Sequence, residues 1–195
     1  MKNIFITITL SFFIISSCTV SKKPFSNTTM NQLAKDSQGN DMLIGKCTRS
    51  ALQAAPFSEW FNSNYDAYKV DSFACTFIKP LLADKSITIF MGTWCGDSRR
   101  EVPRILKMLD CCGFPQNKLA IVMLSNKEGE YKKSPQHEEQ GKNIVRVPTV
   151  IIQEKGIEVG RIIEYPVESL EKDLLAILKK SNYTPNYNNL KVTAR

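Results

Sequence analysis

The clearest hydrophobic pattern lies between residues 86 and 124. Two short apolar runs, ITIFM at 87–91 and LAIVML at 119–124, predict buried strands. Between them, apolar residues at helical spacing predict an amphipathic helix: Val102, Ile105, Leu106 and Leu109. Gly113 and Pro115 mark the end of this helix. A strand, a helix and a second strand in this order predict two parallel strands joined by a right-handed crossover.

The pattern after residue 124 predicts a hairpin and a final helix. Residues 125–146 are a polar connection with room for a short helix. TVII at 149–152 and EVGRII at 158–163, joined through Lys155-Gly156, predict two antiparallel strands. A last helix is predicted by Leu170, Leu174, Ile177 and Leu178. The resulting order, β-α-β-(α)-β-β-α, predicts an α/β fold with a central mixed sheet flanked by helices.

Residues 42–84 predict a helical extension in front of this unit. Ser58 is placed to cap a helix whose apolar face carries four aromatic residues: Trp60, Phe61, Tyr65 and Tyr68. A second helix is expected from Asp71, with Pro80 near its end. We interpret the aromatic stripe as packing against the following domain and not as a ligand site.

The first seventeen residues, MKNIFITITLSFFIISS, are typical of a signal peptide. Their apolar run is too short to span a bilayer. Ile15-Ser16-Ser17-Cys18 resembles the bacterial lipoprotein cleavage box, in which the cysteine carries the lipid. The alternative is an ordinary cleaved signal peptide with an unmodified Cys18. Both interpretations place the protein in the bacterial cell envelope, and the first attaches it to a membrane through a lipid anchor, on the periplasmic side.

The segments that flank the apolar patterns are polar. Residues 18–41 are rich in Ser, Asn, Thr, Lys and Gln, which predicts a flexible tether. Residues 181–195 form a polar C-terminal tail. The 195 residues, of which 43% are hydrophobic, fit one domain with extensions. The net charge of +7 is spread in short groups and not in one long basic run, so we expect no nucleic-acid binding.

The candidate chemistry lies in GTWCGDSRREVP, residues 92–103. Trp94-Cys95-Gly96-Asp97-Ser98 stands between the first predicted strand and its helix, Pro103 follows Cys95 by eight residues, and Val147-Pro148-Thr149 precedes the hairpin. Across residues 86–180 these features resemble the thioredoxin family. The resemblance implies a thioredoxin fold, a redox-active Cys95 and a cis peptide bond at Val147-Pro148. It also implies a substrate groove lined by Trp94, Gly96, Asp97, Val147 and Pro148.

A second resemblance concerns the extension. Residues 44–69 resemble the corresponding region of envelope thioredoxin-like proteins from the Bacteroidetes group. This resemblance agrees with the envelope location that the signal peptide predicts.

The chemistry expected of Cys95 follows from its position. A thiolate is the nucleophile in disulfide exchange, and the N–H groups and dipole of a helix N-terminus stabilise it. Arg99 and Arg100 add positive potential, whereas Asp97 opposes it. The alternative is a buried and inert Cys95. We favour a reactive Cys95, because a turn between a strand and a helix usually exposes its side chains.

Two residues depart from the thioredoxin pattern. Ser98 stands where the resolving cysteine is expected, and Ile89 stands where many members bury an acid. A serine hydroxyl cannot release a partner from a mixed disulfide with Cys95. Ser98 can, however, donate a hydrogen bond to the thiolate. Release therefore requires an external thiol or a membrane reductant.

The other cysteines are not expected to resolve this intermediate. Sixteen helical residues at about 1.5 Å each put Cys111 roughly 24 Å from Cys95. We interpret Cys111 and Cys112 as packing residues at a helix end, since two adjacent thiols are weak grounds for a metal site. Cys47 and Cys75 either pair in an oxidising envelope or remain two free thiols. The sequence indicates no metal and no cofactor.

Three functions are compatible with these residues. The first is monothiol thiol-disulfide exchange through Cys95 with external resolution. The second is a non-catalytic module that binds extended polypeptide in the groove by Trp94 and Pro148. The third, thiol peroxidase, ranks last because Thr93-Trp94-Cys95 lacks the Thr-x-x-Cys spacing. We favour exchange, because the reactive half of the motif is intact, and we expect partners among envelope proteins that carry disulfides or thiols.

Overall fold

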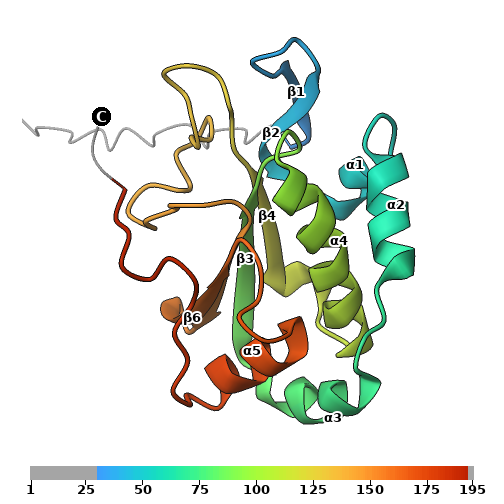
Figure 1. Ribbon diagram of the computed structural model, residues 1–195, viewed down its shortest axis with the longest axis vertical. Coiled ribbons are helices and arrows are strands. Elements are labelled where there is room, and N and C mark those ends of the chain that lie inside the picture. Colours follow the sequence, from blue (N-terminus) through green and yellow to red (C-terminus); the bar gives the residue numbers. More distant parts are fainter. Residues whose placement is uncertain (1–29, 193–195) are drawn as a thin grey trace, which may run out of the picture.

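The computed structural model describes residues 30–192. Within this range the chain forms a six-stranded sheet with the order β1-β2-β4-β3-β5-β6. The strands are β1 (Gln32–Lys35), β2 (Asp41–Cys47), β3 (Lys85–Met91), β4 (Leu119–Met123), β5 (Thr149–Glu154) and β6 (Ile157–Ile163). The α-helices are α1 (Arg49–Leu52), α2 (Ser58–Ala67), α3 (Ser72–Leu81), α4 (Gly96–Cys111) and α5 (Leu170–Leu178), and η1 (Gln116–Lys118) is a 3-10 turn (Figure 1). This is a mixed α/β architecture, as the sequence predicted.

The sheet is built around β3 and β4. These strands are parallel, with Ile89 opposite Ile121, and α4 connects them. β5 pairs antiparallel with both β3 and β6. Lys155 and Gly156, at φ values of 50° and 81°, turn the chain between β5 and β6, as a two-residue hairpin turn requires. The predicted parallel strand pair with its connecting helix and the predicted hairpin are therefore both confirmed.

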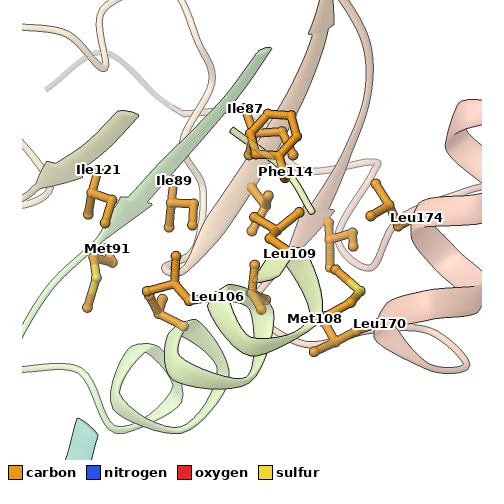
Figure 2. Close-up of a cluster of buried hydrophobic side chains, with 14 of the residues drawn as sticks. Ile87, Ile89, Met91, Leu106, Met108, Leu109, Phe114, Ile121, Leu170 and Leu174 are labelled. Atoms are coloured by element: carbon orange, nitrogen blue, oxygen red, sulfur yellow. The ribbon is translucent and has the colours of Figure 1, made fainter. Parts of the chain in front are cut away.

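One face of the sheet packs against α4 and α5. Figure 2 shows Ile87, Ile89 and Met91 of β3 directed toward leucines of α4, with Leu170 and Leu174 of α5 beside them. All of these side chains are buried. Full burial of one such side chain is worth about 1.5–3 kcal/mol. The apolar periodicity of α4 thus fixes the helix that carries Cys95 against the centre of the sheet.

The opposite face is covered by the connection between β4 and β5. Phe90, Val122 and Ile151 project from the strands and pack with Ile144 and Val147 of this connection. The described connection contains turns and no helix, so the short helix allowed by the sequence does not form. The connection instead brings Val147 against Cys95, which packs on the same cluster.

Two expectations for the N-terminal part were wrong. The described part of the expected tether contains β1, and the expected helical extension begins with β2. β2 pairs with β4, with Gly45 opposite Met123 and Cys47 opposite Ile121. Local sequence patterns do not predict these strands, because both are short and are stabilised mainly by pairing within the sheet. For β2, the partner β4 lies far along the chain.

The helical part of the extension forms as predicted but starts differently. Phe61 on α2 is fully buried, and Tyr65 stacks on it at a centroid distance of 6.0 Å. Ser58 is the first residue of α2 and not its cap, because Phe57 occupies that position without a side-chain bond. Asp71 caps α3 by accepting a hydrogen bond from Ala74 N–H at 2.9 Å. The aromatic stripe packs on the main core, as expected.

The polar C-terminal tail packs on the domain in its described part. Tyr183 Oη donates to Asp173 Oδ2 at 3.1 Å, and Val192 N–H donates to Asn143 Oδ1 at 2.7 Å. Across residues 30–192, no helix combines the length and the apolar character needed to cross a bilayer. The predicted signal peptide at 1–17, Cys18 and the first half of the tether lie outside the described residues.

Candidate redox site

Cys95 lies at the turn between β3 and α4. Its backbone N–H donates to Gly92 O at 3.0 Å, and its carbonyl accepts from Arg99 N–H at 3.0 Å, the first hydrogen bond of the helix. Cys95 is the N-cap residue of α4, with its side chain making no cap bond. The thiol is only partly buried. A fully buried Cys95, the alternative left open by the sequence, is therefore wrong.

Val147 faces Cys95 from the loop before β5. Cys95 Sγ donates to Val147 O at 3.3 Å, and the Val147-Pro148 peptide bond is cis, as expected. Pro148 O in turn accepts from Glu164 N–H at 2.7 Å, which ties the loop to the end of β6. Val147 N–H has no acceptor within the described part of the chain. Its carbonyl is occupied by the Cys95 thiol.

Trp94 covers one side of the site. Its indole Nε1 donates to Leu124 O at 2.7 Å, and its ring lies 5.7 Å from that of Tyr131. A Cβ atom on Gly92 would approach the indole to 2.4 Å. Glycine at position 92 is thus required for this placement of the indole, because any side chain there would collide with it.

Ser98 hydrogen-bonds to the backbone and not, as expected, to the sulfur of Cys95. It is fully buried, and its Oγ accepts a hydrogen bond from Gly92 N–H at 3.3 Å. Among the described residues its Oγ makes no hydrogen bond to Cys95. The expected support of the thiolate by Ser98 is absent, and its hydroxyl instead satisfies a buried N–H at the end of β3.

The other motif residues lie around the helix start. Gly96 is exposed, and Asp97 is paired with Arg100 at 2.7 Å, which offsets its negative charge. Arg99 Nε donates to Thr93 O at 2.5 Å, so its guanidinium braces the turn. The groove residues named from the sequence are therefore brought together at one end of α4.

Lys132 is a neighbour of Cys95 that the sequence did not reveal. Its ammonium lies close enough to Cys95 to interact with a charge on that residue, and it donates a hydrogen bond to Val145 O at 2.5 Å. Burial, with a smaller effect of Arg146, lowers the pKa of Lys132. Lys132 is half-buried and Lys133 is exposed, but two adjacent lysines in a polar stretch carry no signal that tells them apart. Only the folded loop identifies Lys132.

Of the two alternatives for Cys47 and Cys75, a disulfide or two free thiols, the structure shows the second. Both are buried free thiols. Burial raises the pKa of Cys47 to about 12. Cys75 lies beside Cys111 and Cys112, whose side chains add to burial in raising its pKa. The structure thus assigns Cys75 to a different set of neighbours.

The described residues contain no group of three or more side chains arranged to hold a metal ion. His137 is exposed, with Nδ1 3.6 Å from Glu139 Oε1.

Comparison with known proteins adds little to this description. No protein-family model matches the sequence, and no curated protein matches it. A protein of unknown function from Pseudomonas aeruginosa has a similar structure, with a TM-score of 0.47 and 13% sequence identity. The match covers 65% of this chain and 86% of that one. Similarity at this level carries no argument about function.

Proposed function

We propose that this chain has a thioredoxin fold and performs monothiol thiol-disulfide exchange through Cys95. The observation that carries the proposal is the partly exposed thiol at the N-terminus of α4, 3.3 Å from the carbonyl that precedes the cis Pro148. The succession β3-α4-β4, followed by the β5-β6 hairpin and α5, supports this fold. The fold would place a nucleophile beside a loop edge that an extended substrate can reach.

The exchange step is a thiolate substitution. The Cys95 thiolate attacks one sulfur of a partner disulfide, an S–S bond to Cys95 forms, and the other partner sulfur leaves as a thiolate. The helix N-terminus and the charge of Lys132 stabilise the attacking thiolate. Ser98 cannot break the mixed disulfide. An external thiol or a membrane reductant therefore attacks the partner's sulfur and forms a new S–S bond to it, and Cys95 leaves as the free thiolate.

A non-catalytic binding module is the second candidate, and one observation favours it. Val147 N–H has no acceptor within residues 30–192 and lies beside the site. A substrate strand could pair with this N–H without any covalent step. In that case Cys95 would serve only as a contact.

We also propose that the protein acts in the cell envelope, held to a membrane by a lipid on Cys18. Radiolabelled palmitate should label the full chain and leave Cys18→Ala unlabelled. Label that persists in Cys18→Ala would exclude the anchor, and Cys111→Ser is the control for the loss of an unrelated exposed thiol.

Capture of mixed disulfides in cells tests the exchange function. Acid quenching and alkylation, followed by non-reducing electrophoresis, should show adducts of the wild-type chain that disappear on reduction. The adducts should be retained in Cys111→Ser and lost when Cys95→Ala is added to that variant. Adducts that survive in the double variant would refute the role of Cys95. Partner binding that is non-covalent and unchanged in Cys95→Ala would support the binding module instead.

A further inference from the structure

Three cysteines from two helices meet at the end of α4 that lies farthest from Cys95. Cys75 lies on α3, whereas Cys111 ends α4 and Cys112 is its C-cap. Cys75 Sγ lies 3.9 Å from Met108 O, and the same carbonyl accepts a hydrogen bond from Cys112 N–H at 3.0 Å. One carbonyl oxygen therefore has the Cys75 thiol and the backbone of the Cys111-Cys112 pair as neighbours.

The packing of α3 holds this arrangement. Figure 1 shows α3 crossing below the last turn of α4. A Cβ atom on Gly113, directly after the pair, would lie 3.6 Å from Lys79 Cε of α3. Cys111 and Cys112 also lie close enough to the Cys75 thiol to contribute to its raised pKa. The three thiols are thus neighbours through a helix-helix contact and not through sequence.

The three thiols differ in access to solvent. Cys75 is 3% exposed and Cys112 is 1% exposed, whereas Cys111 is exposed. An external disulfide can therefore reach Cys111 but not the other two. Cys75, which neighbours Cys111 and Cys112, is shielded from solvent and can react only with a sulfur that is already at the cluster.

We propose that Cys75, Cys111 and Cys112 form a second thiol-disulfide site, in which Cys111 reacts first with an external disulfide and Cys75 resolves the adduct. The Cys111 thiolate attacks the disulfide R–S–S–R, forming Cys111–S–S–R and releasing one thiolate. Cys75 then attacks Cys111 Sγ, the Cys75–Cys111 bond forms, and the second thiolate leaves. The two protons lost by the cysteines go to the two released thiols, so the cluster is oxidised by two electrons and the external disulfide is reduced.

The product links α3 to the end of α4. Cys95 begins the same helix, so the site joins the extension to the element that carries the proposed exchange thiol. The substrate class is a small disulfide or an accessible protein disulfide in an oxidising compartment. This second site uses neither Cys95 nor Val147 and does not rest on the proposed exchange function.

Oxidised glutathione tests this proposal on the full chain carrying Cys95→Ala, which removes the other partly exposed thiol of the described residues. The reduced protein is incubated with the probe, alkylated, digested and mapped by mass spectrometry. A peptide pair linked through Cys75 and Cys111 is expected. Cys111→Ser, an exposed position, should lose both the link and the glutathione adduct.

The variant Cys75→Ser supplies a second readout. This variant should accumulate a glutathione adduct on Cys111 that persists, because the resolving thiol is gone. The variant Cys112→Ser should still form the disulfide between Cys75 and Cys111. Resolution in the parent should speed up about tenfold per pH unit between pH 7 and 9, because the raised pKa keeps Cys75 mostly protonated. An unresolved adduct in the parent, or a bond between Cys111 and Cys112 in place of the link, would overturn the proposal.

Discussion

The Cys95 thiol donates a hydrogen bond to the carbonyl oxygen of Val147 at 3.3 Å, across 52 positions of sequence. A thiolate has no proton to donate, so ionisation of Cys95 breaks this bond. The Val147 carbonyl then becomes free to accept from a substrate backbone. In the proposed exchange, activation of the nucleophile and exposure of a strand-binding edge are therefore the same event.

Replacing Ser98 with cysteine should create a dithiol. Ser98 is fully buried three residues after Cys95, at the first turn of α4, and a cysteine sulfur would hang from the same Cβ. The new thiol would attack the mixed disulfide on Cys95 and release the partner. Insulin-disulfide reduction with dithiothreitol should rise at least about tenfold over wild type.

The control for this dithiol is Ser98→Ala. It loses the hydrogen bond to Gly92 N–H without gaining a thiol. Its activity should stay at or below the wild-type level. If Ser98→Cys forms the internal bridge and still reduces no more insulin than wild type, the groove is not built for disulfide substrates, and the binding module becomes the better interpretation.

Replacing Gly92 with alanine should displace Trp94. The new methyl would approach the indole to 2.4 Å, so the bond from Trp94 to Leu124 O is expected to break. Overpacking of this kind costs about 1–3 kcal/mol. The tryptophan fluorescence should change, and the midpoint of unfolding should shift to a lower denaturant concentration.

Gly96→Ala is the matched control for this variant. A Cβ at Gly96 meets no atom within 4 Å, and the residue begins α4, where alanine is favourable. Its fluorescence and unfolding midpoint should stay close to wild type. Equal effects of the two variants would mean that the contact between Gly92 and Trp94 does not hold the site together.

Removing the charge of Lys132 should slow the reaction of Cys95. The ammonium favours the nearby thiolate, so Lys132→Met should lower the rate of Cys95 alkylation by iodoacetamide about threefold to tenfold at pH 7. Peptide mapping separates this rate from that of exposed Cys111. Lys133→Met, which loses an exposed lysine bonded to Gly129 O, should leave the rate unchanged.

The pH dependence of this effect follows from burial. Burial lowers the pKa of Lys132, so its charge is lost at a lower pH than that of an ordinary lysine. The rate difference between wild type and Lys132→Met should therefore shrink as pH rises through that lowered pKa. A difference that stays constant up to pH 10.5 would show that the charge is not the cause.

The hydrogen bonds between Tyr68 and Glu171 should contribute measurably to the free energy of unfolding. Tyr68 Oη donates to both carboxylate oxygens of Glu171, at 2.9 and 3.0 Å, and Glu171 is 3% exposed. Tyr68→Phe leaves a buried carboxylate short of one donor, which costs about 1–3 kcal/mol. Chemical unfolding at pH 7 measures this difference.

The same pair predicts a loss of stability in base. Burial, and then the bond to Glu171, raise the pKa of Tyr68 above its ordinary value of 10.0. The unfolded chain therefore loses this proton first, and stability falls as pH rises above 10. Tyr68→Phe should show a shallower decline there. A decline equal to that of wild type would contradict the role of Tyr68.

The local pattern of the sequence was sufficient for the central elements. Continuous apolar runs identified β3 and β4, because these strands are buried on both faces of the sheet. Helical spacing identified α4 and α5, because each of these helices buries one face against the core. The turn before α4 placed Cys95 at a helix start, where its partial exposure could be anticipated. Burial of a face leaves a periodic trace in the sequence, and that trace was correctly interpreted.

Relationships between distant residues were decided only by the tertiary structure. Three such relationships join segments whose local patterns give no sign of the contact. They are the pairing of β2 with β4, the proximity of Lys132 to Cys95, and the proximity of Cys75 to Cys111. Ser98 was misjudged for the same reason, since its motif position suggested Cys95 as partner, whereas its buried hydroxyl pairs with Gly92 N–H. Periodicity reports which face of an element is buried, but the partner on that face is selected by how all the elements pack together.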